Sequence, residues 1–235
     1  MLFQKNRVLC SIFAVVVLLS CCSHGIAWGM QGDTVVILDA GHGGEDGGAV
    51  AADGTPESGI NLQITKKLEW LLLFTGYHSI LTREGDEAVY SPEATTLRQK
   101  KVSDLKNRVA LINGTENAFV ISIHQNSLPS HPNVHGAKVF FNTILPAAQA
   151  GSSVQETLNL AVNPGNERPV TAIDSTIYLM KESVRPAILV ECGFLSNPAE
   201  SKQLQDPSYQ TRLATAIAAG YIAFDTGDRG STYEE

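Results

Sequence analysis

The sequence predicts a single α/β domain in which helices cover both faces of a mostly parallel, twisted sheet. Short apolar runs that are typical of buried strands alternate with segments of helical periodicity, and this alternation indicates a parallel sheet with crossover helices. The chain has 235 residues, of which 43% are hydrophobic and 17% are charged. This composition excludes a disordered chain, and the length is sufficient for one substantial core.

Five segments are expected to form strands. The clearest are the apolar runs at residues 35–38, 119–123 and 187–190, because strands that are buried on both faces of a sheet are mostly apolar. Weaker candidates lie at residues 79–82 and 137–141.

Four helices are expected between and after these strands. Apolar residues recur at helical spacing within residues 61–74, 97–112, 143–160 and 209–224. Gly76 and Gly114 are interpreted as the stop signals of the first two helices.

The ends of the first predicted helix carry two further expectations. Thr55, Pro56 and Glu57 are interpreted as its N-cap, its first helical residue and a first-turn acid. At its other end, Trp70, the apolar residues 71–74 and Tyr77 are expected in the core rather than on a binding surface.

The segment before the predicted domain, residues 1–30, is interpreted as a signal peptide or as a membrane or lipid anchor. Lys5 and Arg7 precede an apolar run at residues 8–19, which has the length of a signal-peptide core and is short for a membrane span. The run ends in Leu-Leu-Ser-Cys, which resembles a bacterial lipobox with Cys21 as the lipidated residue. Cleavage near Ala27 and an uncleaved anchor are the alternatives.

Charge and cysteine content exclude two classes of protein. The net charge of −7 argues against a general nucleic-acid binder, which normally presents a basic face. Four cysteines are too few for a disulfide scaffold, and three of them lie in the leader segment, so that the rest of the chain keeps only Cys192.

Polar residues follow the three clearest strands at the points where these strands end. His42 follows the first within a glycine-rich stretch, His124 ends the second, and Glu191 ends the third. Ligands of open α/β sheets bind beyond the carboxyl ends of the strands, so we expect these side chains to converge if the strands are neighbours. Two imidazoles and a carboxylate are the usual ligands of a catalytic zinc that keeps one position open for water.

The pattern leaves the third ligand open. Glu45, Asp46 and Glu57 all follow the first strand, and spacing does not choose between Asp46 and Glu57. Glu57 can also be interpreted as a partner of its helix dipole. Glu191 occupies an expected buried position, where a carboxylate requires a nearby cation or a raised pKa.

The glycine-rich stretch around His42 has a competing interpretation as a phosphate cradle. It lacks the lysine of a P-loop and the GxGxxG spacing of a dinucleotide site. Elsewhere, His78 is expected on the surface, and His131 and His135 lie in a loop that could line the cleft.

The sequence resembles the zinc-dependent N-acetylmuramoyl-L-alanine amidases of type 3. The matching stretches are, in order, VVILDAGHGGEDGGA, ESGINLQITKKL, LTREGD, LKNRVALIN, VISIHQNS, GAKVFF and RPAILVECGFLSNPAE. They extend over about residues 35–224, so residues 33–225 are expected to form the catalytic domain and residues 226–235 a frayed polar tail.

The resemblance implies a site and a reaction. It implies that one Zn²⁺ ion is held by His42, Glu57 and His124, and it thereby favours Glu57 over Asp46. It implies hydrolysis of the amide between the lactyl group of N-acetylmuramic acid and L-alanine in peptidoglycan. Glu191 would take the proton of the attacking water and pass it to the leaving amine. Asn126 is expected either to bind the substrate or to orient His124.

Within the family, the stretch LRQKKVSDLKNRV and the lack of added wall-binding repeats resemble the germination-specific, spore-cortex branch. This implies a role on the route to muramic-δ-lactam, with the glycan strand and its stem peptide as substrate, and it admits a partner protein. The protein is expected outside the cytoplasm, at the membrane face, the wall or the cortex, with membrane contact only through the leader segment. Residues 91–96 and Cys192 depart from the branch pattern.

Other functions remain compatible with the same residues. A zinc carboxypeptidase or a deacetylase acting on cell-wall material would use a similar ligand set. A non-catalytic wall-binding module is disfavoured, because all four expected site residues are present.

Overall fold

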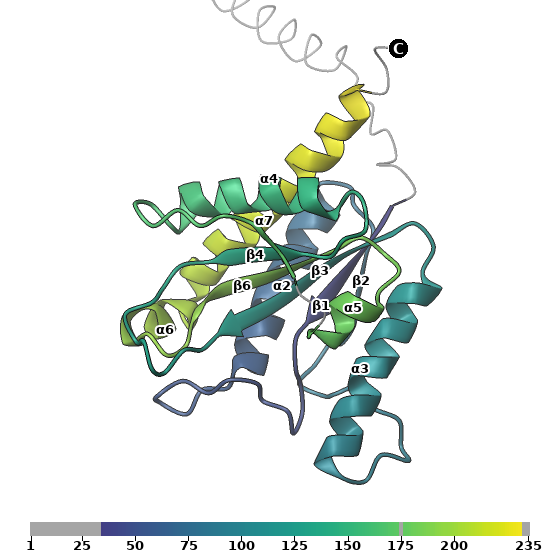
Figure 1. The fold of residues 1–235 in the computed structure, drawn as a ribbon, viewed down its shortest axis with the longest axis vertical. Helices are drawn as coiled ribbons and strands as arrows, with labels where there is room; N and C mark the ends of the chain where they lie inside the picture. Colours follow the sequence, from purple (N-terminus) through teal and green to yellow (C-terminus); the bar gives the residue numbers. More distant parts are fainter. Residues whose placement is uncertain (1–33, 174–175, 232–235) are drawn as a thin grey trace, which may run out of the picture. The chain divides into compact units, whose positions relative to one another are not determined.

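The strands form one sheet in the order β2-β1-β3-β6-β4-β5 (Figure 1). The structure is a computed structural model that describes residues 34–173 and 176–231, with side chains to residue 227. The bounds of the strands are β1 (Val35–Ala40), β2 (Ser79–Leu81), β3 (Ala118–Asn126), β4 (Lys138–Phe141), β5 (Thr171–Ala172) and β6 (Ala187–Phe194). The three clearest predicted strands are β1, β3 and β6, which are adjacent and parallel. Only the pairing of β4 with β6 is antiparallel within this sheet, so the predicted α/β class and mostly parallel sheet are confirmed.

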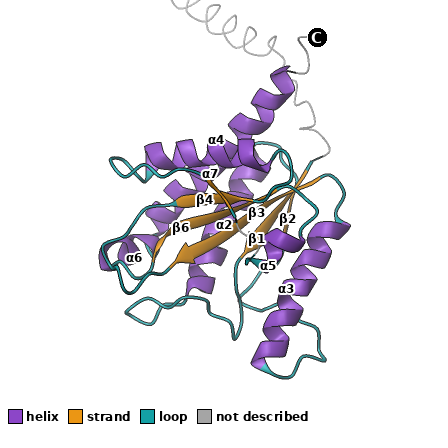
Figure 2. Ribbon diagram, in the orientation of Figure 1, coloured by secondary structure: helices purple, strands orange, loops and turns teal. Residues whose placement is uncertain are grey.

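All four predicted helices are present, and two short ones accompany them (Figure 2). Their bounds are α2 (Glu57–Phe74), α3 (Leu97–Gly114), α4 (Ala147–Ala161), α5 (Tyr178–Glu182), α6 (Pro198–Leu204) and α7 (Pro207–Ser231). α7 continues past its expected end at Phe224, so residues 226–231 of the expected tail are helical. The short elements α5, α6 and β5 were not expected, because so few residues carry no periodic pattern.

Helices cover both faces of the sheet, as predicted. In Figure 1, α2, α4 and α7 lie on one face, and α3 with α5 lies on the other. Successive side chains of a strand point to opposite faces, so Val36 and Leu38 of β1 pack under α2 and α7 while Ile37 packs under α3. Two apolar cores therefore enclose the central strands, which explains why the first residues of each strand are mostly apolar.

The start of α2 differs from the expectation by one residue. Pro56 occupies the N-cap position and Glu57 is the first helical residue. The hydroxyl of Thr55, expected to cap the helix, donates instead to Gln205 Oε1 (3.1 Å). Proline without an N–H is well tolerated at this point, where helical donors have no intrahelical partner.

The prediction that the end of α2 lies in the core is wrong for three residues. Trp70, Leu73 and Phe74 are 68%, 57% and 83% exposed, whereas Leu72 and Tyr77 are buried as expected. Ile64, Leu68 and Leu72 recur at helical spacing and form the buried face of α2, so residues on the other side of the helix face solvent.

The predicted export segment lies outside the described residues, so its cleavage, lipidation at Cys21 or retention stays a prediction. The described residues 34–173 and 176–231 belong to one compact unit. Within the part of the chain that the structure describes, no helix combines the length and the hydropathy needed to cross a membrane.

Adjacent leucines of α2 provide a test of this packing. We expect Leu72→Ala to lower the free energy of unfolding by about 2–5 kcal/mol, because Leu72 is fully buried and its removal leaves a cavity. The neighbouring substitution Leu73→Ala removes an exposed side chain and should change it by less than about 0.5 kcal/mol. Urea unfolding measures both, and equal losses would contradict the observed orientation of the helix.

Candidate active site

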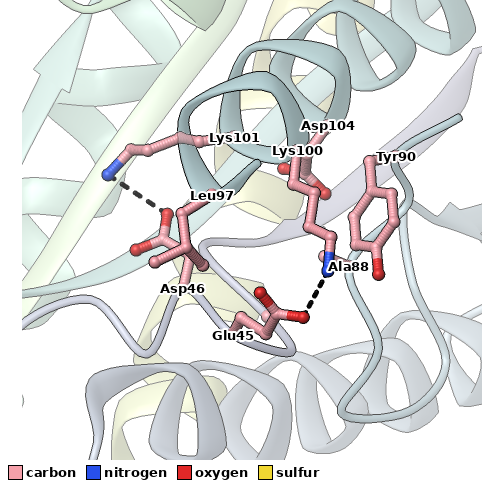
Figure 3. Close-up of a pocket in the computed structure, with 9 residues that line it drawn as sticks. Glu45, Asp46, Ala88, Tyr90, Leu97, Lys100, Lys101 and Asp104 are labelled. Carbon is pink, nitrogen blue, oxygen red and sulfur yellow. Dashed lines mark hydrogen bonds and ion pairs between the residues drawn. The ribbon is translucent and has the colours of Figure 1, made fainter. Parts of the chain in front are cut away.

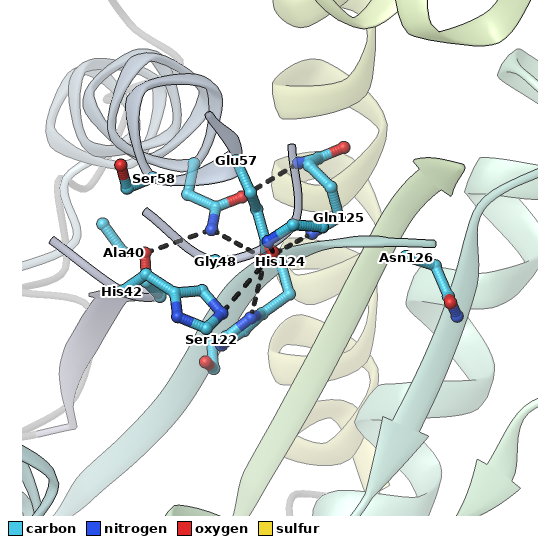
Figure 4. Close-up of polar contacts among 12 residues, drawn as sticks. Ala40, His42, Gly48, Glu57, Ser58, Ser122, His124, Gln125 and Asn126 are labelled. Atoms are coloured by element: carbon cyan, nitrogen blue, oxygen red, sulfur yellow. Dashed lines mark hydrogen bonds and ion pairs between the residues drawn. The ribbon is translucent and has the colours of Figure 1, made fainter. Parts of the chain in front are cut away.

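Three predicted ligands meet at the carboxyl edge of the central strands. His42 follows β1, His124 lies near the end of β3, and Glu57 opens α2 at the same edge. One donor atom from each of these residues lies within 4.8 Å of the others, and Figure 4 shows the side chains pointing toward one another. The predicted convergence of His42 and His124 is therefore observed, because β1 and β3 are neighbours in register.

The carboxylate of Glu57 is held from both sides by backbone amides. Oε2 accepts from the N–H of Ala49 (2.8 Å), and Oε1 accepts from the N–H of Gln125 (2.9 Å). The imidazoles lie against the same two oxygens, with His42 Nε2 3.5 Å from Oε2 and His124 Nδ1 3.0 Å from Oε1. Burial raises the pKa of Glu57, but the imidazoles and the Gln125 amide outweigh it and lower the pKa to about 2.

Asp46, the alternative third ligand, lies on the other side of His42. Its Oδ2 is 3.0 Å from His42 Nδ1, and Lys101 contacts the same oxygen at 3.2 Å. The hydrogen bond with His42 and the charge of Lys101 hold the pKa of Asp46 well below its usual range. An ionised carboxylate only accepts hydrogen bonds, so Nδ1 of His42 donates and Nε2 is left to face Glu57.

His124 is influenced by two carboxylates. Burial lowers the pKa of His124, but the hydrogen bond to Glu57 and the negative charges of Glu191 and Glu57 outweigh burial and raise it above its ordinary value. The cluster therefore favours positive charge at its centre, which is the electrostatic property that a cation site requires.

Two buried arginines hold the backbone that carries His42. Arg108 donates to Asp39 Oδ1 (2.7 Å) and to the carbonyl oxygens of Ala40 (2.8 Å) and His42 (2.7 Å). Arg83 donates to the same Ala40 oxygen (2.9 Å) and to that of Gly41 (3.1 Å). His42 has the left-handed φ of 61°, which is uncommon outside glycine, and this network stabilises it.

Neither arginine is predicted from the sequence to support the site. Arg83 and Arg108 lie inside the motifs LTREGD and LKNRVALIN, but other strands and helices separate both of them from His42 along the chain. Arg108 forms ion pairs with Asp39 and Asp104, both at 2.7 Å. Burial raises the pKa of Asp39, but Arg108 and Ser122 outweigh burial and lower it to about 2. Such a long-range ion pair leaves no local pattern in the sequence.

Glycines at two positions make room for the cluster. A Cβ atom at Gly41 would overlap the imidazole of His124, and one at Gly48 would overlap both Glu57 Oε2 and the ring of His42. Gly48 also has a φ of 70°, which disfavours other residues. The glycine-rich stretch therefore packs closely around the imidazoles and the carboxylate.

Glu191 lies opposite His124 on the adjacent strand β6. Its Oε2 is enclosed and has no hydrogen-bond partner among the described residues. Burial raises the pKa of Glu191 to about 7. The charge of His124 lowers this pKa, and the negative charge of Glu57 raises it further. A half-buried glutamate with one enclosed carboxylate oxygen and a raised pKa agrees with the expected pKa shift and is typical of a group that exchanges protons near neutral pH.

Asn126 and the loop histidines lie apart from this cluster. The amide of Asn126 points away from His124 in Figure 4, and its Oδ1 accepts from the N–H of Ser127 (2.8 Å). His124 is oriented by Glu57, so nothing supports the alternative in which Asn126 orients it. His131 and His135 are exposed and lie outside the metal-capable group.

Two hollows border the cluster. A pocket of about 160 Å³ lies between the loop that carries Asp46 and the first turns of α3, where Lys100 contacts Glu45 and Lys101 contacts Asp46 (Figure 3). A larger groove of about 600 Å³ is lined by segments that follow the first strand, β3 and β6, including Val50, Ser127 and Ser196. The side chains of His42 and His124 are themselves 21% and 22% exposed, so the cluster is accessible to solvent at this edge.

Comparison with known proteins agrees with this fold and site. The family profile described as N-acetylmuramoyl-L-alanine amidase matches residues 36–223. The germination-specific N-acetylmuramoyl-L-alanine amidase of Bacillus subtilis is 34% identical over 193 residues, which are 82% of this chain and 80% of the relative. The chain belongs to the type-3 N-acetylmuramoyl-L-alanine amidase family.

Solved structures of amidases have the same fold. The CwlD amidase of Clostridioides difficile, in complex with the GerS lipoprotein, is 40% identical with a TM-score of 0.79, covering 83% of this chain and 99% of that one. An N-acetylmuramoyl-L-alanine amidase of Clostridium difficile 630 is 27% identical with a TM-score of 0.70, covering 81% and 96%. This protein is accordingly an enzyme with N-acetylmuramoyl-L-alanine amidase activity on peptidoglycan.

The close packing at Gly41 leads to a prediction. Gly41→Ala should displace the His124 ring and lower the affinity for a divalent cation by roughly 10–100-fold, while the fold persists. Gly59→Ala is the matched control, because a Cβ at this α2 position meets nothing within 4 Å. Chelator competition measures the affinity, and an unchanged value for Gly41→Ala would contradict the proposed crowding of His124.

Proposed function

We propose that His42, Glu57 and His124 hold one Zn²⁺ ion and that this chain is a zinc-dependent amidase. The grouping of one donor atom from each residue within 4.8 Å is the observation that carries the proposal. The donor set is the one favoured by catalytic zinc, since it leaves a coordination position open. Asp46, Ala49 and Gln125 contact these donors from outside, as is usual for protein groups that orient metal ligands.

The reaction is the hydrolysis of the amide between the lactyl carbonyl of N-acetylmuramic acid and the nitrogen of L-alanine. Bound at the three ligands, zinc would supply the Lewis acidity that activates water and polarises this carbonyl. Glu191, on the strand beside His124, accepts the proton of the attacking water. It then delivers this proton to the departing amine of L-alanine, which a carboxyl group with a pKa near neutrality does efficiently.

The groove that follows β3 and β6 is proposed to accept the polymeric substrate. It begins at Ser127, next to Asn126, and extends past Ser196 to Gln205 on the α6 side. Asn126 is proposed to hydrogen-bond the substrate, because its side chain points away from the ligand cluster.

The biological setting is proposed from the relatives. The 34% identity to a germination-specific amidase and the 40% identity to CwlD favour the spore-cortex branch, in which stem peptides are removed on the way to muramic-δ-lactam. CwlD is described in complex with a lipoprotein, so we propose that this chain also has a partner protein. Action on peptidoglycan requires export, for which the leader segment is the proposed signal or anchor.

Digestion of purified peptidoglycan tests the proposed reaction. The wild-type protein should release intact stem peptides, detected by mass spectrometry, and a chelator should abolish the release. Removal of a single terminal residue would indicate a carboxypeptidase, and loss of acetyl groups a deacetylase; either result contradicts the proposal. Deletion of the gene should in turn eliminate muramic-δ-lactam from the spore cortex.

Substitutions separate the metal from the proton-transferring group. Glu191→Gln should keep zinc by elemental analysis but lose activity by about 10²–10⁴-fold, whereas His124→Ala should lose the metal. Glu116→Gln is the control. It changes an exposed carboxylate at the opposite edge of the sheet and should leave the zinc content and the activity unchanged. Wild-type turnover in Glu191→Gln would refute the assigned role.

The raised pKa of Glu191 predicts a pH effect on the metal-free protein. The pKa of Glu191 is about 7 in the folded protein, whereas that of a glutamate in the unfolded chain is about 4.3. The stability that is fully present below the unfolded pKa is therefore lost as the pH rises towards and through 7. Glu191→Gln cannot ionise and escapes this loss. Its free energy of unfolding relative to wild type should therefore rise between pH 5 and pH 8, by up to roughly 3 kcal/mol. Urea unfolding of chelator-treated protein measures the difference, and equal values at both pH would contradict the burial of this carboxylate.

A further inference from the structure

Three exposed apolar residues form a patch at the end of α2. Leu73 and Phe74 follow Trp70 by three and four positions, so both lie beside it on the surface of the helix. All three side chains are more than half exposed. We call these three residues the α2 patch. Large exposed side chains gathered on one turn of a helix differ from singly scattered ones and indicate an interaction surface.

The α2 patch lies at the edge of the sheet opposite the active site. α2 ends at Phe74, just before β2, whose Ser79 pairs with Val36 at the start of β1. Leu145, after the antiparallel strand β4, and Val184, before β6, lie at the same edge and are 77% and 61% exposed. These five exposed apolar side chains lie where the parallel strands begin, whereas the ligands lie where they end. Val50, Leu97 and Leu160, which are also exposed, lie elsewhere and do not adjoin the α2 patch in sequence.

The chain also enters the domain at this edge. Thr34 precedes β1 and lines a groove with Val184 and Phe224. The apolar run at residues 8–19 precedes Thr34 by fourteen intervening residues, which can span at most about 50 Å even when fully extended. A run held in a bilayer would therefore keep the edge that carries the α2 patch within about 50 Å of that bilayer.

The chemistry of the α2 patch fits a lipid surface. Tryptophan and phenylalanine favour the interfacial layer between headgroups and acyl chains. Lys66 and Lys67 lie one turn before Trp70, and both are accessible to solvent, so they can approach lipid phosphates. The net charge of −7 disfavours adsorption by charge alone, so apolar insertion has to provide the binding.

We propose that the α2 patch inserts into the outer surface of the cytoplasmic membrane and orients the domain. In that orientation the strands rise away from the bilayer. Since β3 has nine residues, the site would stand about 30 Å above the lipid surface and face the wall. The membrane contact thus extends beyond the leader segment, and it sets the direction in which the active site faces.

The two tryptophans of the chain allow a direct test on the full-length protein. Trp28→Phe leaves Trp70 as the sole tryptophan. In vesicles of phosphatidylethanolamine and phosphatidylglycerol, Trp70 emission should shift to shorter wavelength. Lipids brominated near the headgroup should quench it more than lipids brominated at the chain end. Emission that lipid neither shifts nor quenches would overturn the proposal.

Substitutions in the same background test the patch itself. Leu73→Ser with Phe74→Ser should reduce the quenching of Trp70 by at least half. Leu160→Ser is the matched control. It removes a leucine that is more exposed than Leu73 and lies at the end of α4 far from Leu145, and it should leave the quenching unchanged. Activity on soluble peptidoglycan fragments should be the same in both variants as in the Trp28→Phe background, which confirms that the site is intact.

A competing occupant of the patch would give a different result. If a second copy of the chain covered it, sedimentation without lipid would show a dimer that the Leu73→Ser and Phe74→Ser variant loses. If a protein partner covered it, that partner rather than vesicles would shift the Trp70 emission. Either outcome would overturn insertion into lipid.

Discussion

The buried carboxylate of Glu57 is the contact on which the active site depends. Its two oxygens join the loop after β1, the end of β3 and the start of α2, through the amides of Ala49 and Gln125 and through both imidazoles. A buried charge without such partners is costly, so these three segments must stay together for the carboxylate to remain ionised. Folding of the edge and assembly of the ligand set are therefore one event.

A second layer of buried charge keeps the histidine loop in place. Asp39, Arg108 and Arg83 lie beneath the loop, and the two arginines bind the carbonyl oxygens of residues 40–42. Breaking a buried ion pair by removing one partner typically costs about 3–5 kcal/mol, because the other charge stays buried and unpaired. The left-handed backbone of His42 is thus stabilised by the surrounding network, and the imidazole is oriented before any ligand arrives.

The parallel sheet separates two surfaces of different chemistry. Ionisable groups gather where β1, β3 and β6 end, and the α2 patch lies where they begin. This separation follows from the topology, since parallel strands share their direction and each crossover returns the chain to the starting edge. An enzyme that works on a polymer beside a membrane can use one edge for chemistry and the other for orientation.

The sequence by itself determined the sheet class, the main strands and the long helices, because apolar periodicity is a local property of the chain. It predicted the convergence of His42 with His124 only if their strands are neighbours, and the tertiary structure decided that they are. The residue pattern alone left Glu57 and Asp46 undecided, and only the resemblance to the amidases chose between them. The tertiary structure decided what each one contacts: Glu57 faces both imidazoles, whereas Asp46 binds the far side of His42. It also revealed the part played by Arg83 and Arg108 and turned Trp70 and Phe74 outward. These features depend on contacts between distant segments and on which helix face the core has already filled, and no local pattern encodes either.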